Sequence, residues 1–246
     1  MANQVDPRFA SARPSVGATA SYDEGLRSYM LSIYNYMASG VLLTGLVAVL
    51  FSMGATPEQS LAGQVFLQPG ILKWVIMLAP LGLVMWLSFG INRLSETSAK
   101  AIFWAYAALM GASLSTVFLA YTGASIASTF FATAAGFGAL SLYGYTTKRD
   151  LSGFGKFLLM GVVGIVVASL ANIFFKSSAL SLGISLIGVF VFAGLTVYDT
   201  QKIKNMYAQV EGTDFLGKAV VMGALTLYLD FINLFMFLLR FMGDRR

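Results

Sequence analysis

Two aspartates are the residues whose type and surroundings point most directly to chemistry. Asp230 lies eleven residues into an apolar segment that begins at Ala219, and nine further residues separate it from Arg240. A carboxylate at the centre of a membrane-spanning helix costs about 2.5–3.5 kcal/mol on insertion scales, so such a residue is a functional candidate by default. Asp199 closes the preceding apolar segment. We therefore take the two aspartates as one candidate site.

Each aspartate also has a purely structural interpretation. Asp230 is compatible with a neutral carboxylic acid that is hydrogen-bonded inside a helix bundle and does nothing further. Asp199 is followed by Gln201 and Lys202, and an acid at the end of a helix is often only solvated. The residue types alone leave these alternatives open.

Polar side chains share a helix face with each aspartate. In the last apolar segment Thr226, Asp230 and Asn233 recur at intervals of four and three, which places them on one face of a helix. In the preceding segment Thr196 and Asp199 continue a similar polar stripe. A polar stripe in a membrane must face protein or water instead of lipid. We predict that Thr196, Thr226 and Asn233 face a pore inside the protein.

The composition narrows the chemistry that such a site can perform. The sequence has no cysteine and no histidine, which excludes disulfides, thiolate nucleophiles and the side chain that usually senses pH near neutrality. It also excludes the base of a Ser–His or Cys–His enzyme. Two carboxylates within a few ångström tend to share one proton, and they are hard oxygen ligands suited to Ca²⁺. If Asp199 and Asp230 meet, the pair can sense pH in a chain without histidine, and its oxygens suit Ca²⁺; we expect no resident cofactor.

The elements that position these side chains are membrane-spanning helices. The chain is 57% hydrophobic and 11% charged, whereas a soluble domain is about 25% charged. Its apolar runs approach the roughly 20 residues that a spanning helix needs, and they are apolar on all faces, which disfavours a β-barrel. We predict an all-α integral membrane protein with seven transmembrane helices, near residues 32–51, 74–91, 101–121, 126–145, 157–175, 180–198 and 219–239.

Small residues at four-residue spacing predict where these helices pack closely. Such pairs let two helix backbones approach each other in lipid. The pairs are Gly111 with Ser115, Ala132 with Gly136, and Ala134 with Gly138.

The distribution of basic residues predicts the orientation. Residues 1–27 are polar and contain no apolar segment of a cleaved signal peptide, so we predict a solvated tail there and a membrane domain over residues 28–246. The net charge of +5 does not indicate nucleic-acid binding, because the cations lie in short loops between apolar runs. Cations accumulate on the cytoplasmic side of membrane proteins, which places the N-terminus in the cytoplasm. The cations on that side are Arg8, Arg13, Arg27, Arg93, Lys100, Lys148, Arg149, Lys156, Lys202, Lys204 and Lys218.

The C-terminal end conflicts with this rule. If the seventh segment spans, Arg240, Arg245 and Arg246 lie outside together with Lys73 and Lys176. A re-entrant seventh segment would return these cations to the inside. We favour seven spans because the last apolar run has full spanning length.

Three stretches resemble the transmembrane Bax inhibitor motif family. They are VYDTQKI at 197–203, LTLYLDFINLFMFLLRFMG at 225–243, and GYTTKRDLSGFGKFLLMG at 144–161, which fits the bacterial branch. The resemblance implies six helices wrapped around a central C-terminal helix, in a bacterial inner membrane. It also implies a pH-regulated calcium leak channel that is not an enzyme.

The resemblance assigns roles to particular residues. The proton-sharing aspartates of the family match Asp199 in YDTQ and Asp230 in LYLDFINLF. A basic residue that latches onto the first of these aspartates in some members corresponds loosely to Arg93 in GINRLS. Some relatives also carry an acid in the second helix, and residues 74–91 contain none. A calcium site that needs a third carboxylate is therefore in doubt.

Three other functions compete with the leak channel. Some bacterial relatives associate with a membrane-bound AAA protease, and residues 1–27 would then be the segment that the protease engages. An intramembrane aspartyl protease would use Tyr198 and Asp199 as its YD motif, but Asp230 follows LYL and not GxG. A proton-coupled transporter also uses paired acids, although the inverted repeats of such proteins are not visible.

Overall fold

The computed structural model describes residues 16–54 and 56–245, with side chains described from Ser21 onward except at Pro57. Within this part the chain is helical and contains no strand, only an isolated bridge between Tyr121 and Arg245. The helices are α1 (Val16–Ser52), η2 (Pro57–Gln59), α2 (Leu61–Phe66), α3 (Leu72–Gly90), α4 (Glu96–Leu114), α5 (Thr116–Ala120), α6 (Gly123–Thr146), α7 (Ser152–Phe175), α8 (Ser178–Val210) and α9 (Leu216–Met242).

Seven segments of the described chain are long and apolar enough to cross a membrane, which confirms the predicted fold class. They are α1 from Ser21, α3, α4 together with α5, α6, α7, α8 and α9. The seventh segment is one continuous helix of 27 residues, about 40 Å long at 1.5 Å per residue. This length supports a full span and not a re-entrant segment.

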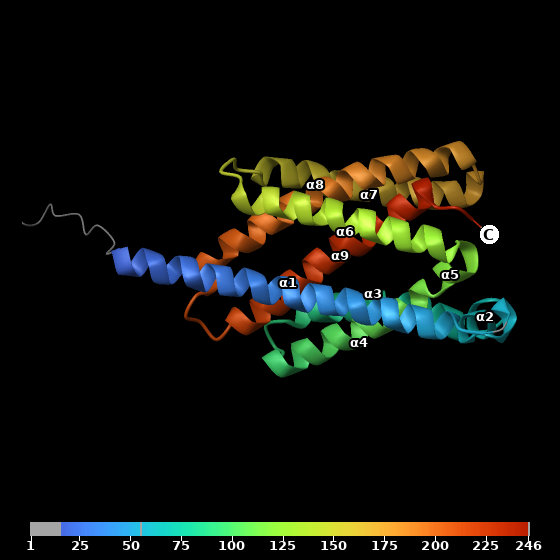
Figure 1. Cartoon of the computed structure of the whole chain (residues 1–246), viewed down its shortest axis with the longest axis horizontal. Coiled ribbons are helices and arrows are strands. Elements are labelled where there is room, and N and C mark those ends of the chain that lie inside the picture. The colour runs from blue at the N-terminus through green and yellow to red at the C-terminus, as the bar shows by residue number, and fades with distance from the viewer. Residues whose placement is uncertain (1–15, 55, 246) are drawn as a thin grey trace, which may run out of the picture.

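The C-terminal helix α9 is the centre of the bundle (Figure 1). In its most apolar window 72% of the residues are buried, against 11–44% in the other spans. Helices α1, α4, α6 and α8 contact α9 directly, whereas α3 packs mainly on α4 and α7 mainly on α8. The six helices predicted around the last one therefore divide into four that contact α9 directly and two, α3 and α7, that lie outside these four.

The chain turns at alternating ends of the bundle. The start of α1 lies at one end, on the left in Figure 1, together with the α3–α4, α6–α7 and α8–α9 turns, and the C-terminus lies at the other. We call the end that contains the start of α1 the N-terminal end. Because successive turns lie at opposite ends of the bundle, each loop can be assigned to one of the two sides of a membrane.

Helix α1 begins at Val16, inside residues 1–27, which we predicted to be a solvated tail. Its early turns pack against the end of α8, where the Tyr22 and Tyr207 rings have centroids 5.2 Å apart. This contact explains why the polar residues before the membrane span are helical. Residues 1–15 of the predicted tail, including Arg8 and Arg13, lie outside the described residues.

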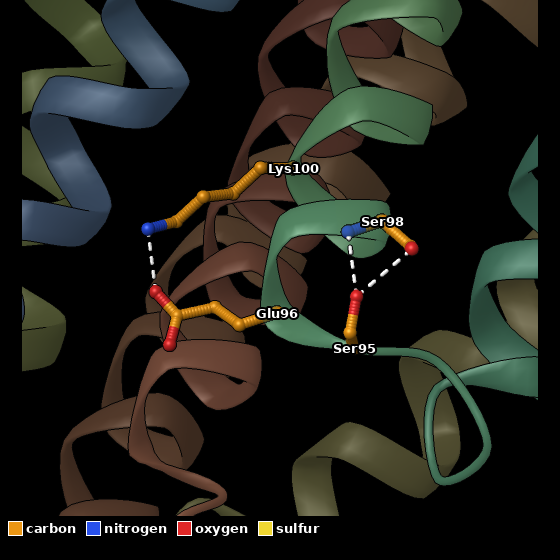
Figure 2. Close-up of polar contacts among 4 residues, drawn as sticks. All are labelled: Ser95, Glu96, Ser98 and Lys100. Carbon is orange, nitrogen blue, oxygen red and sulfur yellow. Dashed lines mark hydrogen bonds and ion pairs between the residues drawn. The ribbon is translucent and has the colours of Figure 1, made fainter.

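The start of α4 is fixed by a capping interaction at the N-terminal end (Figure 2). The Ser95 hydroxyl accepts a hydrogen bond of 3.1 Å from the Ser98 backbone N–H, which satisfies one of the free donors of a helix start. In the next turn Glu96 and Lys100 form an ion pair four residues apart. Lys100 also lies 5.6 Å from the centroid of the Tyr36 ring on α1. These contacts attach α4 to α1 beside the central helix.

Candidate functional site

Asp199 lies inside a helix and not at its end. Helix α8 continues for eleven residues beyond it, to Val210. The extension is helical because Ile203, Tyr207 and Val210 recur at intervals of four and three and are buried on one face. Asp199 itself is only 9% exposed. The interpretation of Asp199 as a solvated acid at a helix end is therefore wrong.

Asp230 lies midway along α9 and is 4% exposed. Its carboxyl group is hydrogen-bonded to that of Asp199 on the neighbouring helix. Two carboxyl groups form such a bond only when a proton lies between them, since two ionised carboxylates are both acceptors. The structure thus brings together the two acids that the sequence singled out, in a geometry that suits one shared proton.

The pair receives little support from other residues. Apart from the contact with Asp199, the buried Oδ2 of Asp230 makes no hydrogen bond in the described part of the chain, and a buried polar atom without a partner costs free energy. No group of three or more Asp, Glu, His or Cys side chains able to hold a metal occurs in the described part of the chain. Ca²⁺ takes six to eight oxygen ligands, so the pair on its own is not a high-affinity calcium site.

The predicted polar side chains Thr196, Thr226 and Asn233 each donate a hydrogen bond to a backbone carbonyl of their own helix. Thr196 is fully buried and donates a hydrogen bond of 2.8 Å to the Phe192 carbonyl. Thr226 and Asn233 donate likewise to carbonyls four residues earlier, at 3.0 Å and 2.8 Å, and are half-buried. They therefore lie on the least covered face of α9, beside the buried Asp230 and not in line with it.

The predicted latch is not formed in this structure. Arg93 is exposed just after α3, which packs mainly on α4 and not on α8. The positive charge that acts on Asp199 is instead that of Lys202, one turn further along α8. The sequence did not distinguish these two cations, because helix-to-helix neighbours cannot be deduced from the position of a residue along its own helix.

A chain of hydroxyl groups that sequence reasoning missed joins α1, α6 and α8 close to Asp199 in the sequence. Tyr34 on α1 and Ser141 on α6 share a hydrogen bond of 2.6 Å, and Ser141 shares another of 2.9 Å with Thr200 on α8. Thr200 is fully buried and directly follows Asp199. The chain thus joins three helices next to the site. The only sequence signal for it is that Thr200 belongs to the YDTQ stretch.

Gln201 holds the α6–α7 turn against α8. Its side-chain amide donates a hydrogen bond of 2.8 Å to the Arg149 carbonyl, and its oxygen accepts one of 3.0 Å from the Leu151 N–H. In the same turn Asp150 accepts a hydrogen bond of 2.9 Å from the Ser152 N–H. Hydrogen bonds from the Ser152 side chain and backbone hold the pKa of the exposed Asp150 carboxyl below its ordinary value. A short polar turn is therefore held two residues from Asp199.

Seven apolar helices around a central helix that carries a buried carboxyl pair define a multi-pass α-helical membrane protein. The family model described as Inhibitor of apoptosis-promoting Bax1 matches residues 26–246. The chain belongs to this family of Bax inhibitor-like membrane proteins, as its motifs suggested, and the match includes both aspartates.

Bacterial proteins resemble the chain over nearly its whole length. A protein of Rickettsia prowazekii is 51% identical over 227 residues, which are 92% of this chain and 93% of the relative. The inner membrane protein YbhL of Escherichia coli strain K12 is 51% identical over 225 residues, or 90% of this chain and 94% of the relative. A protein of Caulobacter vibrioides is 44% identical over 249 residues and 99% of both chains.

Proposed function

We propose that the protein is a pH-regulated calcium leak channel of the bacterial inner membrane, gated by the Asp199–Asp230 pair. The observation that carries the proposal is the direct hydrogen bond between two buried carboxyl groups on different helices, α8 and the central α9. The similarity to the inner membrane protein YbhL supports the location.

Proton exchange at the pair is the gating event. With one proton shared, the carboxyl groups attract each other and hold α8 against α9. When that proton leaves, two negative charges remain in a site from which water is largely excluded, and their repulsion is strong in a low dielectric. The repulsion separates the two helices. The pair therefore converts a change in pH into a change in the packing of the central helix.

Calcium interacts with the pair in transit and is not held there. The carboxylate oxygens, including the buried Oδ2 of Asp230, are hard ligands of the kind that Ca²⁺ prefers. The absence of a third acid in the described surroundings supports weak binding, and an ion must leave a conduction site as readily as it enters.

Calcium flux into proteoliposomes, measured at several pH values, tests this function. The variants Asp199→Asn and Asp230→Asn remove one ionisable group each while keeping the size of the side chain, and we expect each to abolish the pH dependence of the flux. Asp214→Asn, in the exposed α8–α9 turn, is the control and retains the native pH profile. An unchanged pH profile in both site variants would refute gating by the pair.

A further inference from the structure

A groove runs between α1 and α6 down to the central helix. Its larger part is a cavity of about 700 Å³ that extends along α1 from Arg27 to Leu42 and reaches Phe231 of α9. A second cavity of about 360 Å³ continues it and shares Val41, Phe130 and Phe231. In Figure 1, α1 and α6 lie at the front with α9 between them. The groove therefore opens sideways, toward the membrane.

The larger cavity is long enough to hold an acyl chain. Eight residues of α1 between Arg27 and Leu42 line it, and this stretch rises about 23 Å at 1.5 Å per residue, more than the about 15 Å of half a hydrocarbon core. The volume lies within the roughly 300–1,000 Å³ of small-molecule sites. Its lining is almost entirely apolar, with polar groups near the N-terminal end. This gradient matches an acyl chain below a polar headgroup.

Cations lie on both sides of the N-terminal end of the groove. Arg27 lines the groove on α1, and Lys148 and Arg149 follow directly after the end of α6, whose Tyr145 also lines it. All three cations are exposed. The ion pair found in the described part of the chain joins Glu96 to Lys100, so none of the three is paired with a carboxylate there. Such a cluster attracts an anionic headgroup.

We propose that the groove binds one anionic phospholipid, with an acyl chain between α1 and α6 and the phosphate near Arg27, Lys148 and Arg149. The site is independent of calcium transport.

Retention of lipid by the purified full-length chain tests this site. The protein in mild detergent is mixed with equal amounts of phosphatidylglycerol and phosphatidylcholine of the same acyl chains, and bound lipid is measured by native mass spectrometry. We expect one retained phosphatidylglycerol. Gly138→Phe is expected to lower its retention by at least about tenfold, because the ring occupies the volume that the acyl chain needs. A Cβ at Gly138 meets nothing within 4 Å, so the backbone tolerates the change.

Gly136→Phe is the matched control. It lies on the same helix, is equally exposed and unobstructed, and does not line the groove, so we expect native retention. If Gly138→Phe fails to fold, Ala134→Leu narrows the same groove and must also reduce retention. Replacing Arg27, Lys148 and Arg149 by Gln should leave a bound lipid but lower the preference for phosphatidylglycerol by about fivefold for each cation removed.

Three results would overturn the proposal. Equal retention by the Gly138→Phe and Gly136→Phe variants, or native retention by Ala134→Leu, would show that the lipid binds elsewhere. Equal retention of phosphatidylglycerol and phosphatidylcholine by the native chain would show that the site does not select an anionic headgroup. A native dimer that Gly138→Phe dissociates would assign the groove to a second copy of the chain.

Discussion

At the scale of single residues, the sequence predicted Asp230 better than Asp199. Twenty mostly apolar neighbours around one carboxylate are sufficient to predict that Asp230 is buried in a bundle. Asp199 was ambiguous because its apolar run ends there, and the eleven helical residues that follow are held by contacts with α1, such as that between Tyr22 and Tyr207. Contacts between distant segments are not encoded in local spacing. The hydroxyl chain through Ser141 was unpredictable for the same reason.

The exposed Asp150 provides a prediction about pH and stability. Because its hydrogen bonds with Ser152 lower its pKa in the folded protein, the ionised form stabilises the fold. This stabilisation is fully present above the ordinary Asp value of about 3.9 and is lost as the pH falls through the lowered pKa. Thermal unfolding in detergent should therefore show Asp150→Ala slightly less stable than the native chain from pH 7 to pH 5.

The same measurement at lower pH provides the control. The difference in thermal stability between the native chain and Asp150→Ala should shrink as the pH falls below that range. The native carboxyl then becomes protonated, and its hydrogen bonds with Ser152 lose the contribution of the negative charge. A difference that grows on acidification would contradict the role given to this hydrogen bond.

At the scale of helices, periodicity predicted the elements but not all their contacts. Among the small residues singled out, Gly111 does allow close packing, since a Cβ there would lie 2.5 Å from the Thr44 carbonyl oxygen on α1. Gly136 and Gly138 meet nothing within 4 Å, so the prediction of a close helix contact at these two is wrong. The close α6–α8 contact is instead made at Gly144, whose Cβ would meet the Val197 carbonyl oxygen. In a membrane protein lipid-facing and buried faces are both apolar, so spacing alone does not identify the packed face.

A matched pair of substitutions on α6 tests this assignment. Gly144→Ala should destabilise the fold by about 1–3 kcal/mol, because the added methyl group forces α6 away from the α8 backbone. Gly138→Ala should be neutral or stabilising by up to about 1 kcal/mol, since it reduces the backbone freedom of an unobstructed helix position. Unfolding of the two variants in detergent measures both effects. Equal stability of the two would show that α6 and α8 do not pack at Gly144.

At the scale of the whole molecule, apolar length predicted the number of spans, and the family resemblance predicted the central position of the last one. Hydropathy did not identify α9 as central, because the α7 window is more apolar, with mean hydropathy 2.4 against 1.8, yet is 11% buried against 72%. The refinement into four inner and two outer helices has no sequence signal, because α3 and α7 are as apolar as the inner helices.

The orientation of the bundle in the membrane is a proposal. It can be tested because successive turns lie at opposite ends, so each turn has an expected side of the membrane. With seven spans, the N-terminal end carries the α3–α4, α6–α7 and α8–α9 turns, and the C-terminus lies at the opposite end (Figure 1). Cations predominate at the N-terminal end, which favours a cytoplasmic location for that end. The C-terminal cations at the other end have aromatic partners: Arg240 lies 5.9 Å from the centroid of the Phe237 ring, and Arg245 lies 5.9 Å from that of Tyr121. Such pairs suit the membrane interface.

Single cysteines determine the orientation directly, because the native chain has none. We expect Ser178→Cys, at the α7–α8 turn, and Arg245→Cys, near the C-terminus, to react with a membrane-impermeant maleimide on intact spheroplasts. Asp214→Cys, at the α8–α9 turn, should react only after permeabilisation. All three positions are exposed, so accessibility to the reagent depends on the side of the membrane. Labelling of Asp214→Cys alone would show that the orientation is the reverse of the one proposed. Protection of both Arg245→Cys and Asp214→Cys would show that α9 re-enters on the cytoplasmic side instead of crossing.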